Sequence, residues 1–187
     1  MRQQDSKLLR TVLTGALAAM VYVVTLFRFP LLGSKVHFAN GVCLLSGLLL
    51  GPLWGGAAAG LGSALYDLFA GEGVVTALIT FVSKFAMAWV CGWLMGLPGS
   101  RKRKLDRTAL SCVAGALTYV ALYMLKTYIY NRFVYAYPLD AVGVTLMSKL
   151  IPSLINAGAA VVAAPIFYHA ILPALRASGV LKQLGEE

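Results

Sequence analysis

The sequence predicts an all-α integral membrane protein, and three observations lead to this fold class. Hydrophobic residues make up 59% of the 187 residues, whereas charged residues make up 12%. The mean hydropathy of +0.78 is typical of chains that span a lipid bilayer. The apolar residues also fall into separate stretches, most of them close to the roughly 20 residues that a helix needs to cross the hydrocarbon core. We therefore expect a membrane protein and not a soluble globule.

Six apolar stretches follow one another along the chain and predict a bundle of six transmembrane helices. They form a single membrane domain over residues 1–187 and lie at roughly 8–27, 37–50, 52–70, 75–97, 108–131 and 142–173. The second and third stretches are short, and Gly51-Pro52 lies between them. Because glycine and proline are the residues least suited to a helix interior, we expect a tight turn at this point.

The distribution of lysine and arginine predicts the orientation of the bundle, because these residues collect on the cytoplasmic side of membrane proteins. With both termini in the cytoplasm, the inner segments hold ten basic residues: Arg2, Lys7, Arg10, Arg101, Lys102, Arg103, Lys104, Arg107, Arg176 and Lys182. The outer segments hold three, namely Arg28, Lys35 and Arg132. The basic run RKRKLDR at 101–107 is then a cytoplasmic loop. We expect a multi-pass protein of the cell membrane whose partner is the lipid bilayer, with no nucleic acid bound.

Four ionisable residues lie inside predicted helices: Asp67, Lys84, Lys126 and Lys149. With alternating helix directions and a rise of about 1.5 Å per residue, all four fall in the outer half of the membrane. A charged side chain at such a depth is costly, so by default it faces the bundle interior or an aqueous cavity and serves function. These residues therefore predict a functional site beneath the outer surface.

Other polar residues share helix faces with these charges. Residues three or four apart lie on the same face of a helix, and this spacing places hydroxyls, amides and tyrosine rings on the stripes that carry the lysines. Such a mixture is the composition of a small-molecule pocket. The predicted substrate-binding residues are Lys84, Asp67, Lys126, Lys149, Asn40, His37, Tyr123, Tyr130, Thr80 and Asn156.

Several of these residues also have a structural explanation, which the sequence leaves open. Lys126 and Lys149 lie close enough to the membrane surface to extend their ammonium groups to the lipid headgroups. Lys84 could form a buried ion pair with Asp67 that joins two helices without any ligand. The tyrosines between 128 and 137 could belong to an interfacial aromatic belt. His37 could cap a helix instead of contacting a ligand.

Small residues at every fourth position allow membrane helices to approach closely. Two such rows run along 51–64, which predicts that this helix is surrounded by others on more than one side. A further row consists of Thr11, Gly15 and Ala19. If this row faces outward, it is a docking face for another membrane protein; if it faces inward, it is ordinary packing. The sequence leaves both readings open.

The residues do not predict an enzyme. Intramembrane catalysis needs a nucleophile with a base, paired acids or a histidine-rich metal site. The chain offers two separated histidines, His37 and His169, and three cysteines without metal-type spacing that we expect to be packing residues. We therefore expect no cofactor and no metal. The sequence also contains no nucleotide-binding P-loop, so any ATP hydrolysis must take place in partner subunits.

The stretch VHFANGVCLLSGLLLGPLWGGAAAGLGSALYDLF at 36–69 resembles a segment of the S components of energy-coupling factor (ECF) vitamin transporters. In that family, a loop ending in Val-His leads into a short helix, Leu-Leu-Gly-Pro, a glycine-rich helix and a terminal aspartate. The stretch TALITFVSKFAMA at 76–88 resembles the family's segment with a lysine in the fourth helix. The resemblance spans nearly the whole chain and is closest to the branch of riboflavin-type, pyridoxine-type and hydroxymethylpyrimidine-type S components.

The resemblance implies a high-affinity vitamin site at the outer ends of the last three helices, capped by the loop RFPLLGSKVHF at 28–38. It also implies that the small row at 8–27 docks onto a transmembrane T component driven by two cytoplasmic ATPases. Gly15 and Ala19 lie at the positions of the family's Ala-x-x-x-Ala motif, with glycine in place of the first alanine. The implied location is the bacterial plasma membrane, where the S component topples to release its cargo.

The residues predict the chemical class of the substrate but not its identity. Three lysines favour an anionic or carbonyl-rich ligand, and tyrosines favour a flat heterocycle that can stack. A vitamin B6 form or a pyrimidine precursor fits both, and so do riboflavin, a deazaguanine base and an acidic vitamin. The alternative function is a stand-alone secondary transporter or channel for a small polar or anionic solute. The sequence shows no inverted repeat and no polar path across the membrane that would favour it.

Overall fold

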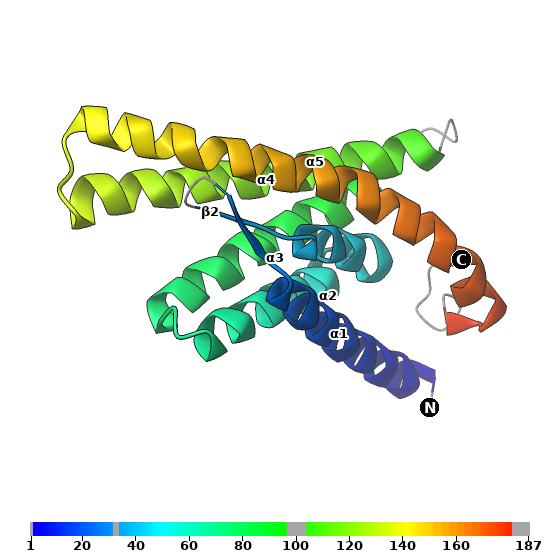
Figure 1. Cartoon of the computed structure of the whole chain (residues 1–187). Helices are drawn as coiled ribbons and strands as arrows, with labels where there is room; N and C mark the ends of the chain where they lie inside the picture. Colours follow the sequence, from blue (N-terminus) through cyan, green and yellow to red (C-terminus); the bar gives the residue numbers. More distant parts are fainter. Residues whose placement is uncertain (1, 32–33, 97–103, 181–187) are drawn as a thin grey trace.

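The computed structural model describes residues 2–31, 34–96 and 104–180 and consists of long helices with one short β-hairpin (Figure 1). The helices are α1 (Arg2–Leu26), α2 (Ala39–Phe69), α3 (Val74–Gly96), α4 (Lys104–Ile129) and α5 (Leu139–Ala177), and the π-helix η1 (Tyr130–Val134) directly follows α4. Strands β1 (Phe29–Leu31) and β2 (Ser34–Val36) pair antiparallel, with Phe29 opposite Val36. The hairpin lies within the segment 28–38 that the sequence predicted as a loop.

Five helices of the described residues are long and apolar enough to cross a membrane. They are α1 to α5, with η1 extending the fourth. The prediction of an all-α, multi-pass membrane fold is therefore confirmed. The count of six helices, the single domain over 1–187 and the cytoplasmic placement of both termini stay predictions. Arg101, Lys102, Arg103 and Lys182, on which the predicted orientation partly depends, lie outside the described residues.

The segment α2 spans both short helices predicted at 37–50 and 52–70, and its helical geometry is interrupted between them. Its backbone leaves helical geometry at Gly51, where φ is +74°, a conformation that glycine adopts without steric cost. The hydroxyl of Ser46 lies 2.7 Å from the carbonyl oxygen of Cys43 and 2.9 Å from that of Gly55, on either side of the break. The thiol of Cys43 also lies 4.0 Å from the hydroxyl of Ser63, 20 positions later, so the second half of α2 runs back alongside the first. The chain therefore reverses at Gly51-Pro52, where the sequence predicted a tight turn.

The glycines of α2 leave room for two neighbouring helices. A Cβ atom added to Gly56 would lie 3.0 Å from the ring of Phe85 in α3. A Cβ atom added to Gly62 would collide with the carbonyl oxygen of Ala18 in α1. Helix α2 is therefore packed between α1 and α3, which confirms that its small residues allow close approach on more than one side.

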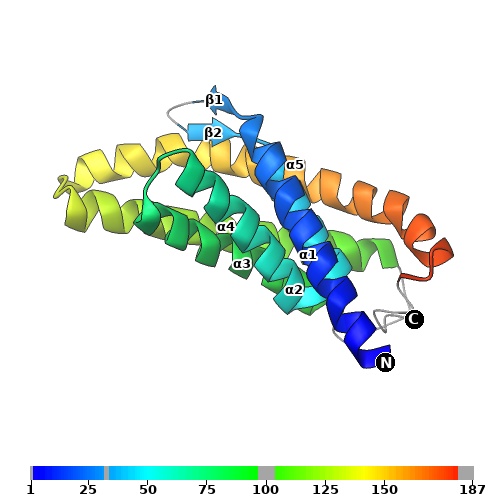
Figure 2. The same cartoon turned by 90° about the horizontal axis from the view of Figure 1, so that it is seen from below.

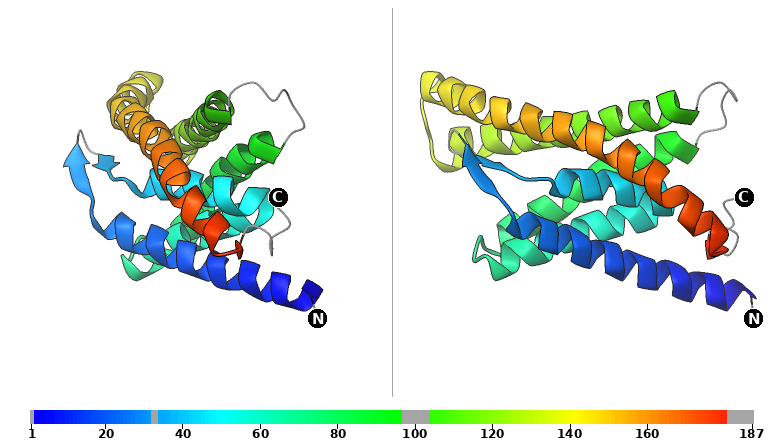
Figure 3. Two further views of the ribbon diagram at one scale, coloured as in Figure 1. Left: turned by 90° about the vertical axis from the view of Figure 1, so that its right-hand side faces the viewer. Right: turned by 45° about the vertical axis from the view of Figure 1, so that its right-hand side comes forward.

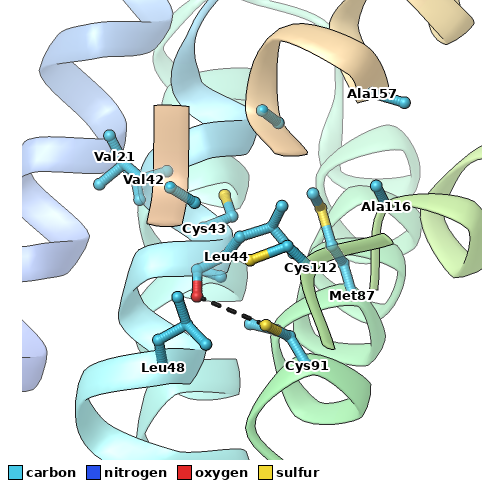
Figure 4. Close-up of a cluster of buried hydrophobic side chains, with 14 of the residues drawn as sticks. Val21, Val42, Cys43, Leu44, Leu48, Met87, Cys91, Cys112, Ala116 and Ala157 are labelled. Carbon is cyan, nitrogen blue, oxygen red and sulfur yellow. Dashed lines mark hydrogen bonds between the residues drawn. The ribbon is translucent and has the colours of Figure 1, made fainter. Parts of the chain in front are cut away.

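A cluster of buried apolar side chains fills the middle of the bundle (Figure 4). All five long helices contribute to it: Val21 comes from α1, Leu44 from α2, Met87 from α3, Cys112 from α4 and Ala157 from α5. The three cysteines of the chain are buried, carry free thiols and belong to this cluster. They act as small packing residues, as the sequence predicted.

Different segments of the chain lie at the two ends of the bundle. The start of α1 and the end of α5 lie at one end, whereas the β-hairpin, the α2–α3 turn and the α4–α5 connection lie at the other (Figure 1, Figure 2 and Figure 3). Helices α4 and α5 lie side by side and antiparallel, and the connection between them is at the hairpin end. The hairpin end therefore collects the segments that the sequence predicted on the outer side.

Candidate functional site

A cavity of about 490 Å³ lies at the hairpin end of the bundle, between all five long helices and the hairpin segment. It is lined by Thr25, Arg28, Pro30, His37, Ser63, Tyr66, Asp67, Glu72, Thr76, Thr80, Lys84, Tyr119, Tyr123, Lys126, Lys149, Ser153 and Asn156. Eight of the ten predicted substrate-binding residues are among them. The two others, Asn40 and Tyr130, lie outside the lining. Residues from distant parts of the chain therefore meet in one polar cavity.

Lys84 of α3 lies at the floor of this cavity, with only 3% of its surface exposed. Its ammonium group donates a hydrogen bond to the amide oxygen of Asn40 in α2. It also lies 3.8 Å from the centroid of the Tyr119 ring in α4, within the range of a cation–π interaction. Asn40, 1% exposed, thus stands behind Lys84 and holds it. In the described residues these contacts replace the ion pair with Asp67 that the sequence left open.

Asp67, Lys126 and Lys149 enter the upper part of the cavity from α2, α4 and α5. All three are half-buried. Asp67 and Lys149 act electrostatically on Lys126, the first attracting and the second repelling its charge. This arrangement brings charges from three helices to one wall of the site.

Tyrosine rings of α4 form an aromatic wall. Tyr119 and Tyr123 both line the cavity, and their rings stack with centroids 6.1 Å apart and an interplanar angle of 20°. Tyr130, which the sequence also placed in the site, instead lies beside Tyr135 at 6.4 Å. Tyr130 is the first residue of the π-helix, and its ring centroid lies 5.8 Å from the ammonium group of Lys126.

The β-hairpin is attached at both ends to elements that surround the cavity. Arg28 lies before the hairpin, with Nη1 3.8 Å from Oε1 of Glu72 in the α2–α3 turn and the guanidinium 4.9 Å from the Tyr66 ring centroid. After the hairpin, the backbone N–H of His37 donates to Oδ1 of Asn156 in α5 at 2.9 Å. The hairpin therefore lies as a strap across the side of the cavity.

The small-residue row of α1 points away from the bundle. Thr11, Gly15 and Ala19 are exposed, and a Cβ atom added to Gly15 would meet nothing within 4 Å. The opposite face of α1, which includes Ala18 and Val21, is buried against the bundle. The row is thus free to contact another protein or lipid, while docking itself stays a prediction.

The described residues contain no group of three or more His, Cys, Asp or Glu side chains that could hold a metal ion. The polar groups of the cavity are instead ammonium groups, carboxylates, hydroxyls, amides and phenol rings. Such groups can bind and orient a polar organic molecule. Binding of this kind is the chemistry that the arrangement supports.

Comparison with known proteins agrees with this description. Residues 6–172 match the family model described as "ECF-type riboflavin transporter, S component". A solved structure described as "Structure and mechanism of the S component of a bacterial ECF transporter" has a TM-score of 0.69 at 16% identity and covers 89% of this chain and 96% of its own. No curated protein matches the chain. The chain therefore belongs to the ECF-type riboflavin transporter S components, a family of substrate-binding membrane subunits of transporters.

Proposed function

We propose that this chain captures a small planar heterocycle of the vitamin class on the outer face of a bacterial plasma membrane. The observation that carries the proposal is the cavity itself, in which tyrosine rings and lysines face the same space. Its volume of about 490 Å³ falls within the roughly 300–1,000 Å³ of small-molecule sites. Stacking on Tyr123 and hydrogen bonds from the lysines would hold the ring and its polar edge.

The first candidate substrate is a vitamin B6 form or a pyrimidine precursor. Both combine a flat ring with several oxygen or nitrogen groups at its edge, which suits a cavity lined by hydroxyls, amides and ammonium groups. The second candidate is riboflavin, and the description of the matching family favours it. The two candidates differ in size and absorbance, so one binding experiment separates them.

Native mass spectrometry of the detergent-purified protein is the direct test. A compound that stays bound through purification and is released on denaturation would identify the substrate by its mass. Titration with riboflavin, pyridoxine, pyridoxal and hydroxymethylpyrimidine then measures affinity, and we expect one of them to bind with a Kd in the micromolar range or below. A protein that is empty and is not stabilised against heat by any of the four would contradict the proposal.

Delivery to the cell interior is proposed to require a T component and two ATPases. The exposed row of Thr11, Gly15 and Ala19 supports this, because small residues on a lipid-facing helix allow a second membrane protein to approach closely. The alternative is a stand-alone secondary transporter or channel. Substrate uptake into liposomes that contain this chain alone, without ATP, would favour the alternative.

A further inference from the structure

The charged side chains that line the cavity are not balanced. The basic ones are Arg28, Lys84, Lys126 and Lys149, and the acidic ones are Asp67 and Glu72. Charges in surroundings of low dielectric constant are costly unless they are paired and hydrogen-bonded. The partner of each basic group therefore indicates which part of the cavity is suited to a ligand.

Two of the basic groups are already paired within the protein. Arg28 lies 3.8 Å from Glu72. Lys84 has the amide oxygen of Asn40 and the face of the Tyr119 ring. Neither group depends on a ligand to compensate its charge, so the excess lies elsewhere in the cavity.

The excess positive charge is that of Lys126 and Lys149, which reach the cavity from the neighbouring helices α4 and α5 (Figure 2). Within the described part of the chain, neither ammonium group makes a hydrogen bond or an ion pair. Lys126 lies 5.8 Å from the centroid of the Tyr130 ring, and it experiences the charges of Asp67 and Lys149. Asp67 and Glu72 attract the charge of Lys126, whereas Lys149 repels it.

We infer that Lys126 and Lys149 form an anion subsite, which holds a phosphate or carboxylate group of the transported compound. Each ammonium group offers three N–H donors, and hydrogen bonds between charged groups are roughly twice as strong as neutral ones. An anion between the two lysines also removes their mutual repulsion. The ring of the compound then lies against Tyr123, which lines the same cavity. This inference rests on the proposed function and adds the charge of the substrate to it.

The competing explanation is that both lysines extend to lipid headgroups and serve only to position their helices. Under that explanation, an anionic compound gains nothing over its neutral counterpart. Matched pairs of compounds therefore separate the two: pyridoxine against pyridoxine 5′-phosphate and 4-pyridoxate, and riboflavin against riboflavin 5′-phosphate.

The experiment is calorimetric titration of the full-length protein in detergent with each compound. We expect an anionic member of at least one set to bind at least tenfold more tightly than the neutral member. In the double variant Lys126→Met/Lys149→Met, this preference falls below twofold, while the Tm of the protein in detergent stays near the wild-type value and so reports intact folding. Lys149→Arg keeps the charge and retains the preference. Arg132→Gln removes an exposed charge outside the cavity and also retains it.

Each other outcome overturns the inference. Neutral members that bind as tightly as every anionic member exclude the anion subsite but leave the proposed function in place. A preference that survives in the double variant shows that the two lysines do not cause it. If no compound of the panel binds to the wild-type protein, the proposed function fails, and the anion subsite fails with it.

Discussion

At the scale of single residues, Lys84 shows how a membrane helix can hold a charge. The ammonium group is stabilised by one amide oxygen and one ring face, from Asn40 and Tyr119 on the two neighbouring helices. A buried polar network is stable only while each of its members is satisfied. Loss of the ammonium group leaves the Asn40 oxygen without its donor and removes a polar group from the cavity floor.

Lys84→Met keeps the length of the side chain and removes its charge. We expect the substrate identified by native mass spectrometry to bind at least tenfold more weakly to this variant, equivalent to about 1.4 kcal/mol, at near-normal protein yield. Calorimetric titration measures the change. Lys7→Met, which removes an exposed charge near the start of α1, is the control. Unchanged affinity in Lys84→Met would remove Lys84 from the site.

Helical spacing predicted most of the site because the helices are regular where they line the cavity. Thr80 and Lys84, one turn apart, both face it. Spacing could not show that Asn40 stands behind Lys84, because the two residues meet only through the packing of α2 on α3, 44 positions apart in sequence. The pairing of Arg28 with Glu72 leaves no periodic pattern either. The residues that share one face of a helix follow from their spacing in the sequence. Contacts between different helices depend on how the chain folds.

At the scale of elements, the hairpin strap has one hydrogen bond that a single substitution removes. The Asn156 side chain accepts it from the backbone of His37, directly after β2. Helix α5 is thereby linked to the segment that borders the cavity. The strap should open more often when this link is lost.

Asn156→Ala tests the link. We expect hydrogen–deuterium exchange at residues 34–38 to accelerate several-fold, and the bound compound to dissociate faster, because both require the strap to move. Ser148→Ala is the matched control, since its hydroxyl bonds only the carbonyl of Thr145 within α5 at 2.9 Å and does not line the cavity. Equal exchange rates in the two variants would show that Asn156 does not restrain the strap.

Gly15 of α1 and Gly62 of α2 have opposite surroundings. Gly62→Ala puts a methyl group against the backbone of Ala18 and 2.8 Å from Cβ of Val21. We expect a loss of about 1–3 kcal/mol, typical of overpacking, seen as a lower Tm in detergent. Gly15→Ala meets open space and should leave the Tm unchanged or slightly raised. Similar Tm values for the two variants would contradict the packing of α2 against α1.

At the scale of the whole molecule, the sequence predicted an all-helical membrane bundle because hydrophobic length is directly visible in it. The reversal within α2 was also predictable. Gly51 and Pro52 predicted a turn between two short helices, and the chain does reverse within α2 at Gly51, where φ is +74° and after which Ser63 lies beside Cys43. Glycine and proline together mark this reversal in the sequence because neither residue suits a helix interior.

Gly15→Leu tests the docking face on the scale of the assembled transporter. A Cβ atom at this exposed position meets nothing within 4 Å, so we expect normal ligand binding together with loss of co-purification with the T component. Gly143→Leu, which adds the same bulk at an exposed position of α5 with open space around it, is the control and should co-purify normally. Loss of ligand binding in Gly15→Leu would indicate internal packing instead of docking.

The buried cluster of Figure 4 determines how a bound compound leaves the cavity. One turn beyond Lys84 and the two residues that hold it, each helix turns apolar. Leu44 follows Asn40 in α2, Met87 follows Lys84 in α3 and Ala116 precedes Tyr119 in α4, and all three belong to this cluster. Among the described residues the cavity is therefore a dead end. A compound that enters such a cavity leaves by the opening through which it entered, so the affinity of the site and the directionality of transport are separate properties. The affinity depends on the side chains that line the cavity. The direction of transport depends on what exposes the same opening to the other compartment.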